Sequence, residues 1–138
     1  MALQYSVTVR NAQLDAVEST ISSSAKLRLY SGSIPANCAA AATGTMLINM
    51  TLPADWMAAA SAGSKALSGS WTMTGDAGAG SGTNAGYFRV WDSGVATTHI
   101  QGTVTITGDG GDMTLDNPNI ASGQTVSVTT FTLTAGNA

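Results

Sequence analysis

The chain has 138 residues, the size of one domain that buries a substantial hydrophobic core without disulfides or a structural metal. Only 9% of the residues are charged, the net charge is −3, and the five basic residues are scattered along the sequence. This distribution offers no basic stripe for phosphates, so we expect no nucleic-acid partner. With 43% apolar residues, the composition also excludes a disordered chain.

We expect neither a membrane span nor a secretion signal. No window approaches the roughly 18 apolar residues of a membrane-spanning helix, and the N-terminal MALQYSVTVRN lacks a basic region followed by an apolar one. Cys38 is the only cysteine, and its alanine-rich neighbourhood supplies no group that would activate the thiol. We therefore expect Cys38 to behave as a small apolar residue.

Residues 6–22 predict a helix, because their apolar residues recur with the helical period. The apolar positions near one helical face are Val7, Leu14, Val17 and Ile21. The start of the helix has two interpretations. Ser6 would cap a long helix, whereas Asn11 would cap a shorter one, since the β-branched residues between them are weak helix formers.

Two half-buried strands are predicted next, at residues 26–30 and 45–52, where apolar residues alternate with small or polar ones. Residues 53–63 then predict a short helix of about two turns. Pro53 suits the first helical position and Gly63 suits the end of the helix.

The last two thirds of the chain predict a succession of strands, rich in β-branched and aromatic residues and bounded by turn residues. These strands are residues 69–74, 87–91, 97–107, 112–115 and 124–134. In the final strand the apolar register slips, which predicts a bulge near Thr129 and Thr130 or burial of both faces. Residues 75–86 are too small and polar for a strand, so we expect a flexible exposed loop or one ordered by a partner.

Together these elements predict a mainly β protein, an antiparallel jelly-roll-like sandwich with an N-terminal helix and a short inserted helix. No repeat or linker divides the sequence. We therefore expect a single domain over residues 1–138, with the helix at about 6–22 and the sandwich at about 25–135.

The stretch ITGDGGDMTLDNPNI, residues 106–120, holds three aspartates among glycines and could suggest a calcium site. The glycine-aspartate repeat that binds calcium needs a large apolar residue where this chain has Thr114, and it needs neighbouring copies that are missing here. We instead predict a tight hairpin, a short strand at 112–115 and a second turn, with no metal. The three residues concerned are Asp109, Asp112 and Asp116.

The sequence gives no support for an enzyme or a cofactor. His99 is the only histidine and is predicted to be a polar surface or partly satisfied side chain on a strand. The chain has no G-x-S-x-G elbow for a serine nucleophile. A carboxylate pair for glycoside hydrolysis is only formally possible, as Asp92 with Asp55 or Asp76, because Glu18, the single glutamate, lies on the predicted helix.

Aromatic residues supply the candidate contact sites. Tyr87, Arg89 and Trp91 share one face of a predicted strand. If the other face is the core, they form an exposed aromatic and arginine stripe of the kind enriched at binding hot spots. The alternative, carrying equal weight, is that this central strand is buried on both faces. Trp56 is a further candidate contact residue.

Three stretches carry a resemblance to a known family. They are VRNAQLDAVESTI, LPADWMAAASAG and GDMTLDNPNIASGQTVSVTTFTLTAGNA. Together with the strands between them, they resemble the capsid cement, or decoration, proteins of tailed bacteriophages. The resemblance implies a jelly roll that is made in the host cytoplasm and forms a homodimer on the outer surface of the phage head. It also implies binding across neighbouring subunits of the major capsid protein, with no catalysis and no cofactor.

Two alternative functions remain open at this point. A glycan-binding module of a phage fibre or tail would use Trp91, Tyr87 and the 75–86 loop as a stacking platform. A head-to-tail adaptor or tail-completion protein would be structural but present in far fewer copies per particle. A pocket with convergent polar groups around His99 would favour an enzyme.

Overall fold

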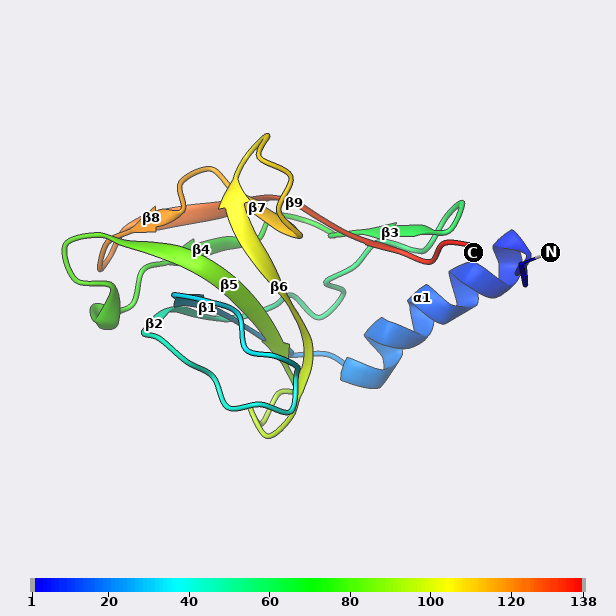
Figure 1. Ribbon diagram of the computed structural model, residues 1–138, viewed down its shortest axis with the longest axis horizontal. Helices are drawn as coiled ribbons and strands as arrows, with labels where there is room; N and C mark the ends of the chain where they lie inside the picture. The colour runs from blue at the N-terminus through cyan, green and yellow to red at the C-terminus, as the bar shows by residue number, and fades with distance from the viewer. Residues whose placement is uncertain (1, 138) are drawn as a thin grey trace.

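The computed structural model describes residues 2–137 and is mainly β, with one α-helix at its N-terminal side (Figure 1). This agrees with the predicted class. The elements in chain order are α1 (Val7–Ile21), β1 (Lys26–Ser31), β2 (Met46–Thr51), β3 (Ser64–Ala66), β4 (Thr72–Thr74), the 3₁₀ turn η1 (Ala77–Ala79), β5 (Thr83–Trp91), β6 (Thr98–Ile106), β7 (Met113–Leu115), β8 (Asn119–Ile120) and β9 (Thr125–Thr134).

The strands form one open sheet in the order β2-β1-β5-β6-β7-β9-β3, with β4 also paired to β9 and β8 to β5. The pair β6 and β7 is parallel, whereas the other strand pairs within the described residues are antiparallel. The prediction of a purely antiparallel architecture is therefore wrong, and the sheet is mixed.

The sheet bends back on itself, so that its two halves share one hydrophobic core. Phe88 on β5 packs edge-on against Phe131 on β9 with ring centroids 5.4 Å apart, although two strands separate β5 from β9 in the sheet order. Trp71 lies 5.4 Å from Phe131, and Trp56 lies 6.2 Å from Trp71. These large rings fill the space between the two halves.

Helix α1 begins at Val7, and Ser6 caps it by accepting a hydrogen bond from the Val9 backbone N–H at 3.3 Å. The longer of the two predicted helices is therefore correct, because the cap compensates for the β-branched first turn. After Ile21 the chain turns at Ser22, which has a φ of 72°. Figure 1 shows α1 projecting from the β body alongside β3 and the C-terminal end of β9.

The predicted short helix at residues 53–63 is wrong. Its residues 56–61 are extended and pair with residues 64–68, as shown by the hydrogen bond from Ala58 N to Ala66 O at 2.8 Å. Ala62 and Gly63 both have positive φ, 52° and 77°, as a two-residue type I′ hairpin turn requires. Burial of Trp56 in the core outweighs the local helix signals.

Residues 75–86 are only in part the exposed loop that their composition predicts, since most of residues 76–82 are exposed but the two ends of the segment pack against other segments. Thr83–Gly86 belong to β5, and Ala79 and Ala85 are buried. Gly75 and Gly86 allow close approach of backbone to backbone, since an added Cβ would lie 2.0 Å from Ala121 O and 1.9 Å from Gly32 O. Small residues are needed here because the chain segments pack against each other.

The turn after β6 differs from the predicted hairpin, because β7 runs parallel to β6 after only a short connection. The connection returns along β6 and is fastened to it by threonine hydroxyls. Gly111 N donates to Thr105 Oγ1 at 3.0 Å, and Asp112 Oδ2 accepts from Thr103 N and Oγ1, both at 2.8 Å. The predicted short strand is confirmed as β7.

The predicted bulge in the last strand is confirmed. Thr114 on β7 pairs with Thr130 on β9, but Leu115 pairs with Val128, so Thr129 is skipped in the register. The extra residue shifts the alternation by one position, and Val126, Val128 and Phe131 all become buried on the same core.

Candidate functional site

Three of the four candidate contact residues lie inside the chain. Trp56, Tyr87 and Arg89 are at most 1% exposed, and Trp91 is half-buried. The expected exposed stripe on this strand is therefore wrong, and the alternative, burial of β5 on both faces, is confirmed. Hydrophobic spacing alone did not decide between the two, since the covering segment is distant in sequence.

The outer face of β5 is covered by residues 32–45. The Tyr87 hydroxyl donates to Thr43 O at 2.6 Å and accepts from Thr43 N at 2.9 Å. Its ring stacks on Tyr30 of β1 at a centroid distance of 5.0 Å. Tyr87 therefore holds one end of the covering segment against the sheet.

Arg89 holds the middle of the same segment. Its Nη1 donates to Ala40 O at 2.8 Å and its Nη2 to Asn37 O at 3.3 Å. Nη2 also donates to Gln101 Oε1 at 2.9 Å, and Gln101 Nε2 donates in turn to Pro35 O at 2.8 Å. A guanidinium suits this role because its planar fork reaches several carbonyls at once.

Helix α1 is docked onto the β3 hairpin by a buried lysine. Lys65 Nζ lies 2.8 Å from Asp15 Oδ1 and 3.0 Å from Glu18 Oε2, and only 3% of the lysine side chain is exposed. The two carboxylates also accept the backbone N–H groups of Ala60 and Met57, both at 3.1 Å. Residues on α1 thus satisfy the polar groups of the extended segment beneath it.

These contacts shift two pKa values. The hydrogen bond from Lys65, followed by the one from Ala60 N–H, lowers the pKa of Asp15 below its usual value of 3.8. Burial acts to lower the pKa of Lys65, but the hydrogen bonds to Asp15 and Glu18 and their negative charges outweigh it. The pKa of Lys65 is therefore raised above 10.5.

The outer face of α1 is exposed and uncharged. We define it as Val9, Gln13, Ala16 and Thr20, which follow the spacing of one helical face. Helix α1 and the residues that precede it project from the β body, and we call them the arm. Further exposed apolar residues lie at the N-terminal end of this arm, where Leu3 is 71% and Val7 47% exposed. Helices that face only water usually carry charges there. The sequence of α1 could have indicated this uncharged face, since few of the polar residues in the helix are charged.

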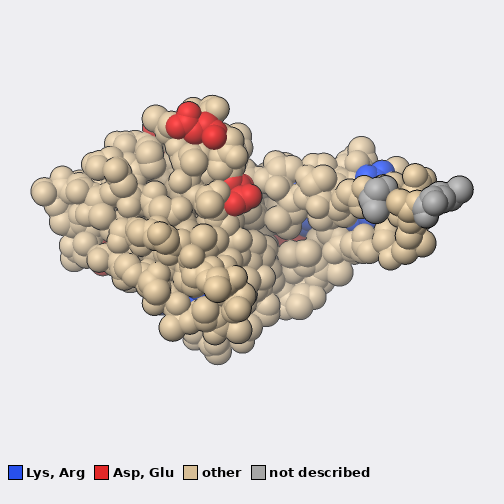
Figure 2. All heavy atoms as spheres, in the orientation of Figure 1, with Lys and Arg blue, Asp and Glu red and all other residues tan. Residues whose placement is uncertain are grey.

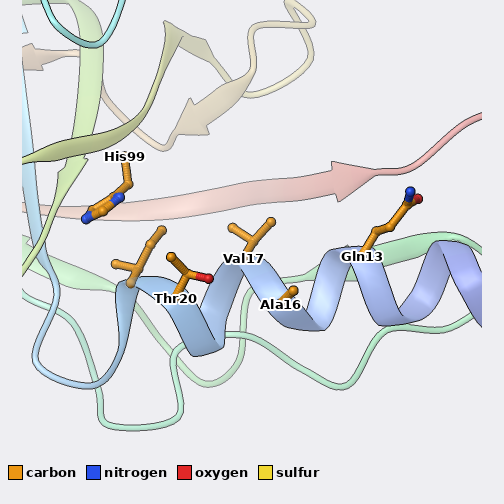
Figure 3. Close-up of a pocket in the computed structure, with 6 residues that line it drawn as sticks. Gln13, Ala16, Val17, Thr20 and His99 are labelled. Atoms are coloured by element: carbon orange, nitrogen blue, oxygen red, sulfur yellow. The ribbon is translucent and has the colours of Figure 1, made fainter.

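A hollow of about 300 Å³ lies between α1 and β6, beside the C-terminal end of that outer face. Figure 3 shows His99 reaching from β6 toward Val17 and Thr20 on the helix. The lining residues are Gln13, Ala16, Val17, Thr20, Ile21 and His99. The polar lining residues besides His99 are Gln13 and Thr20, and no carboxylate is among them. Within residues 2–137 the His99 ring makes no side-chain hydrogen bond.

Two of the three aspartates of residues 106–120, Asp112 and Asp116, accept hydrogen bonds from backbone N–H groups. Asp116 Oδ1 accepts from Asn117 N at 2.8 Å and from Ser127 N at 2.9 Å, while Asp112 is bound to Thr103. Within residues 2–137 no three metal-ligating side chains come together.

Among the same residues, 2–137, no helix is long and apolar enough to cross a membrane.

Comparison with protein-family models, curated protein sequences and solved structures finds no match for this chain. The surface itself is distinctive. Figure 2 shows a face almost free of charged atoms, with acidic side chains gathered in small groups over the β body and basic atoms visible near the α1 end. A surface of this kind makes contacts through backbone, hydroxyl and small apolar groups.

Proposed function

We propose that this chain is a non-enzymatic virion protein that binds the outer surface of a bacteriophage head and stabilises the lattice of major capsid protein subunits. The observation that supports it most is the α1 arm, which extends beyond the β body with an uncharged outer face and exposed apolar residues at its tip (Figure 1). An exposed apolar arm of this kind marks a protein-contact surface. The link to phage heads comes from the resemblance of the sequence to cement proteins.

Within this proposal, the arm forms the homodimer contact. Two α1 helices that pack antiparallel about a twofold axis bring the N-terminal end of each beside the C-terminal end of the other. The exposed apolar residues at one end, among them Val7 and Val9, then meet the hollow between Val17, Ile21 and His99 at the other. Ala16 at the centre of the outer face allows close approach of the two helices.

The β body is then the part that contacts the major capsid protein on the particle. The proposal includes the jelly-roll-like sandwich that the resemblance implies. It is supported by the bend of the sheet, which brings β5 and β9 face to face across the core through Phe88 and Phe131.

Binding to an assembled lattice stabilises that lattice by mass action. A protein that binds only the intact shell contributes about 2.7 kcal/mol per site when its free concentration is roughly 100 times Kd. Summed over the shell, this resists the pressure of the packaged DNA. Contacts that use few charges hold at high salt, because screening acts on ion pairs.

The test is the thermal stability of particles. Particles depleted of the protein are expected to release DNA at a lower temperature than complete particles, and adding back the purified chain is expected to restore the transition. An unchanged release temperature contradicts the cementing role. Counting copies per particle by quantitative mass spectrometry separates a protein that covers the lattice from a head-to-tail adaptor.

The glycan-binding alternative requires Tyr87 and Trp91 to form an exposed stacking surface, and Tyr87 is not exposed. Tyr87 is buried beneath Thr43, and the 75–86 segment packs against the sheet. Trp91 alone keeps an accessible part. Stacking on a sugar needs an exposed aromatic face, so no feature of the β5 region favours this function.

A further inference from the structure

Two arginines stand directly opposite each other in the sheet. Arg28 on β1 and Arg89 on β5 are register partners, and both guanidinium groups lie over the ring of Trp91, at 5.9 Å and 5.7 Å from its centroid. Like charges in this position repel each other. Among residues 2–137 neither arginine makes an ion pair, although acidic residues outnumber basic ones in the chain.

Arg89 is a buried charge without a counter-charge. It is 1% exposed, and its Nη atoms bind neutral oxygens, while its Nε–H has no partner. The indole N–H of Trp91 is likewise buried without a partner. By contrast, the indoles of Trp56 and Trp71 donate to Ser22 O and Ser68 O. Buried donors that lack an acceptor are rare and costly.

Both residues border a hollow of about 380 Å³. We call it the Arg89 hollow; its lining residues are Cys38, Ala39, Ala40, Ala41, Arg89, Trp91, Ala96, Thr97 and Thr98. The lining includes a guanidinium, an indole and two threonines, and most of the other residues are alanines. The lining thus combines a few hydrogen-bond donors with an apolar surface, which is typical of small-ligand sites.

We infer that the Arg89 hollow binds a carboxylate carried on a short apolar group. An arginine cannot lose its proton, so an anion offsets the cost of burying its charge more fully than the neutral oxygens around it do. A carboxylate supplies two acceptor oxygens, one for each of the two unpartnered donors, Arg89 Nε–H and Trp91 Nε1–H. The alanine methyl groups and the Trp91 ring receive the apolar part of the ligand.

A carboxylate fits this lining better than a phosphate does. A phosphate has more oxygens to satisfy, and the alanine walls would leave them without donors. Both nitrogens are covered in this structure, so the ligand reaches them only where the lining of the hollow moves. The carboxylate comes either from a free organic acid or from an acidic side chain or chain end of a protein.

Nuclear magnetic resonance of the tryptophan indole N–H groups tests the site in the intact chain. Titration with sodium propionate is expected to shift the Trp91 indole signal downfield to saturation, with a dissociation constant in the millimolar range. Trp56 and Trp71 are internal controls, since their indoles already have acceptors. No saturable shift of Trp91, or an equal shift with sodium chloride at the same ionic strength, overturns the inference, as does tighter binding of phosphate than of propionate.

Cys38 provides a second measurement, because its half-buried thiol lines the hollow. Saturating propionate is expected to slow the alkylation of Cys38 by iodoacetamide severalfold, and Trp91→Phe is expected to weaken this protection while the chain stays folded. Equal protection in both proteins contradicts the role of the indole. A capped tripeptide with a central glutamate distinguishes the source, since tighter binding than propionate assigns a protein carboxylate and weaker binding a free acid.

Discussion

Lys65 lies beneath α1 with its ammonium group between two carboxylates of the helix. Burial of a lysine is costly unless it is paired, and here Asp15 and Glu18 pair it while they also accept backbone N–H groups. The same logic does not operate at Arg89, where the hydrogen-bond partners are neutral. The fold therefore supplies negatively charged partners for the buried Lys65 but only neutral ones for the buried Arg89.

Removal of the charge at position 65 is expected to loosen α1. Lys65→Met keeps most of the side-chain volume but leaves the two carboxylates facing each other, so the free energy of unfolding should fall by about 1–3 kcal/mol. Chemical denaturation measures this change. The control is Lys26→Met on β1, where no ion pair is lost and the change should stay within about 0.5 kcal/mol. Similar losses in both variants contradict the role of Lys65.

Acid is expected to weaken the same contact. The pKa of Asp15 is lower in the folded chain than in the unfolded one, so its contribution is complete above the unfolded pKa, usually 3.8. That contribution is lost as pH falls through the folded pKa. Thermal unfolding below about pH 4 should therefore depend more steeply on pH in the wild type than in Asp15→Asn. Parallel pH profiles would rule this out.

At the scale of elements, local residues predicted some features well and others poorly. The capped helix and the β9 bulge follow from neighbouring residues, Ser6 and the slipped register around Thr129. The segment at 53–63 did not follow its local signals, because Trp56 is needed in the core. The parallel pairing of β6 and β7 is held by hydroxyl contacts of Thr103 and Thr105 to the connecting residues, which no periodicity reveals.

The proposed dimer makes a prediction about α1. Ala16→Glu places a charge at the centre of the outer face, and a charge without a partner in the interface should raise the dimer dissociation constant by more than ~10-fold, about 1.4 kcal/mol. Analytical ultracentrifugation measures this, and circular dichroism should show a folded chain. Ala77→Glu in η1 is the matched control, as an exposed alanine outside α1. A wild-type monomer at all concentrations, or an unaffected dimer, contradicts the assignment.

The whole molecule has two parts, a β body around one core and an arm formed by α1 (Figure 1). The sequence predicted the strand content and the helix, but it could not predict the path of the sheet, because the path depends on pairings distant in sequence. It also could not show that residues 32–45 cover β5, since Tyr87 and Arg89 have the composition of either a contact surface or a buried clamp.

The two ends of the described chain meet on the arm, where Tyr5 N donates to Asn137 Oδ1 at 2.8 Å. Residues 5 and 137 therefore lie side by side, and a short peptide could join these two positions without crossing the β body. A tag attached near either of these two residues emerges beside α1, at the proposed dimer contact. For display of a foreign peptide, the connections at the opposite end of the β body are the better insertion points.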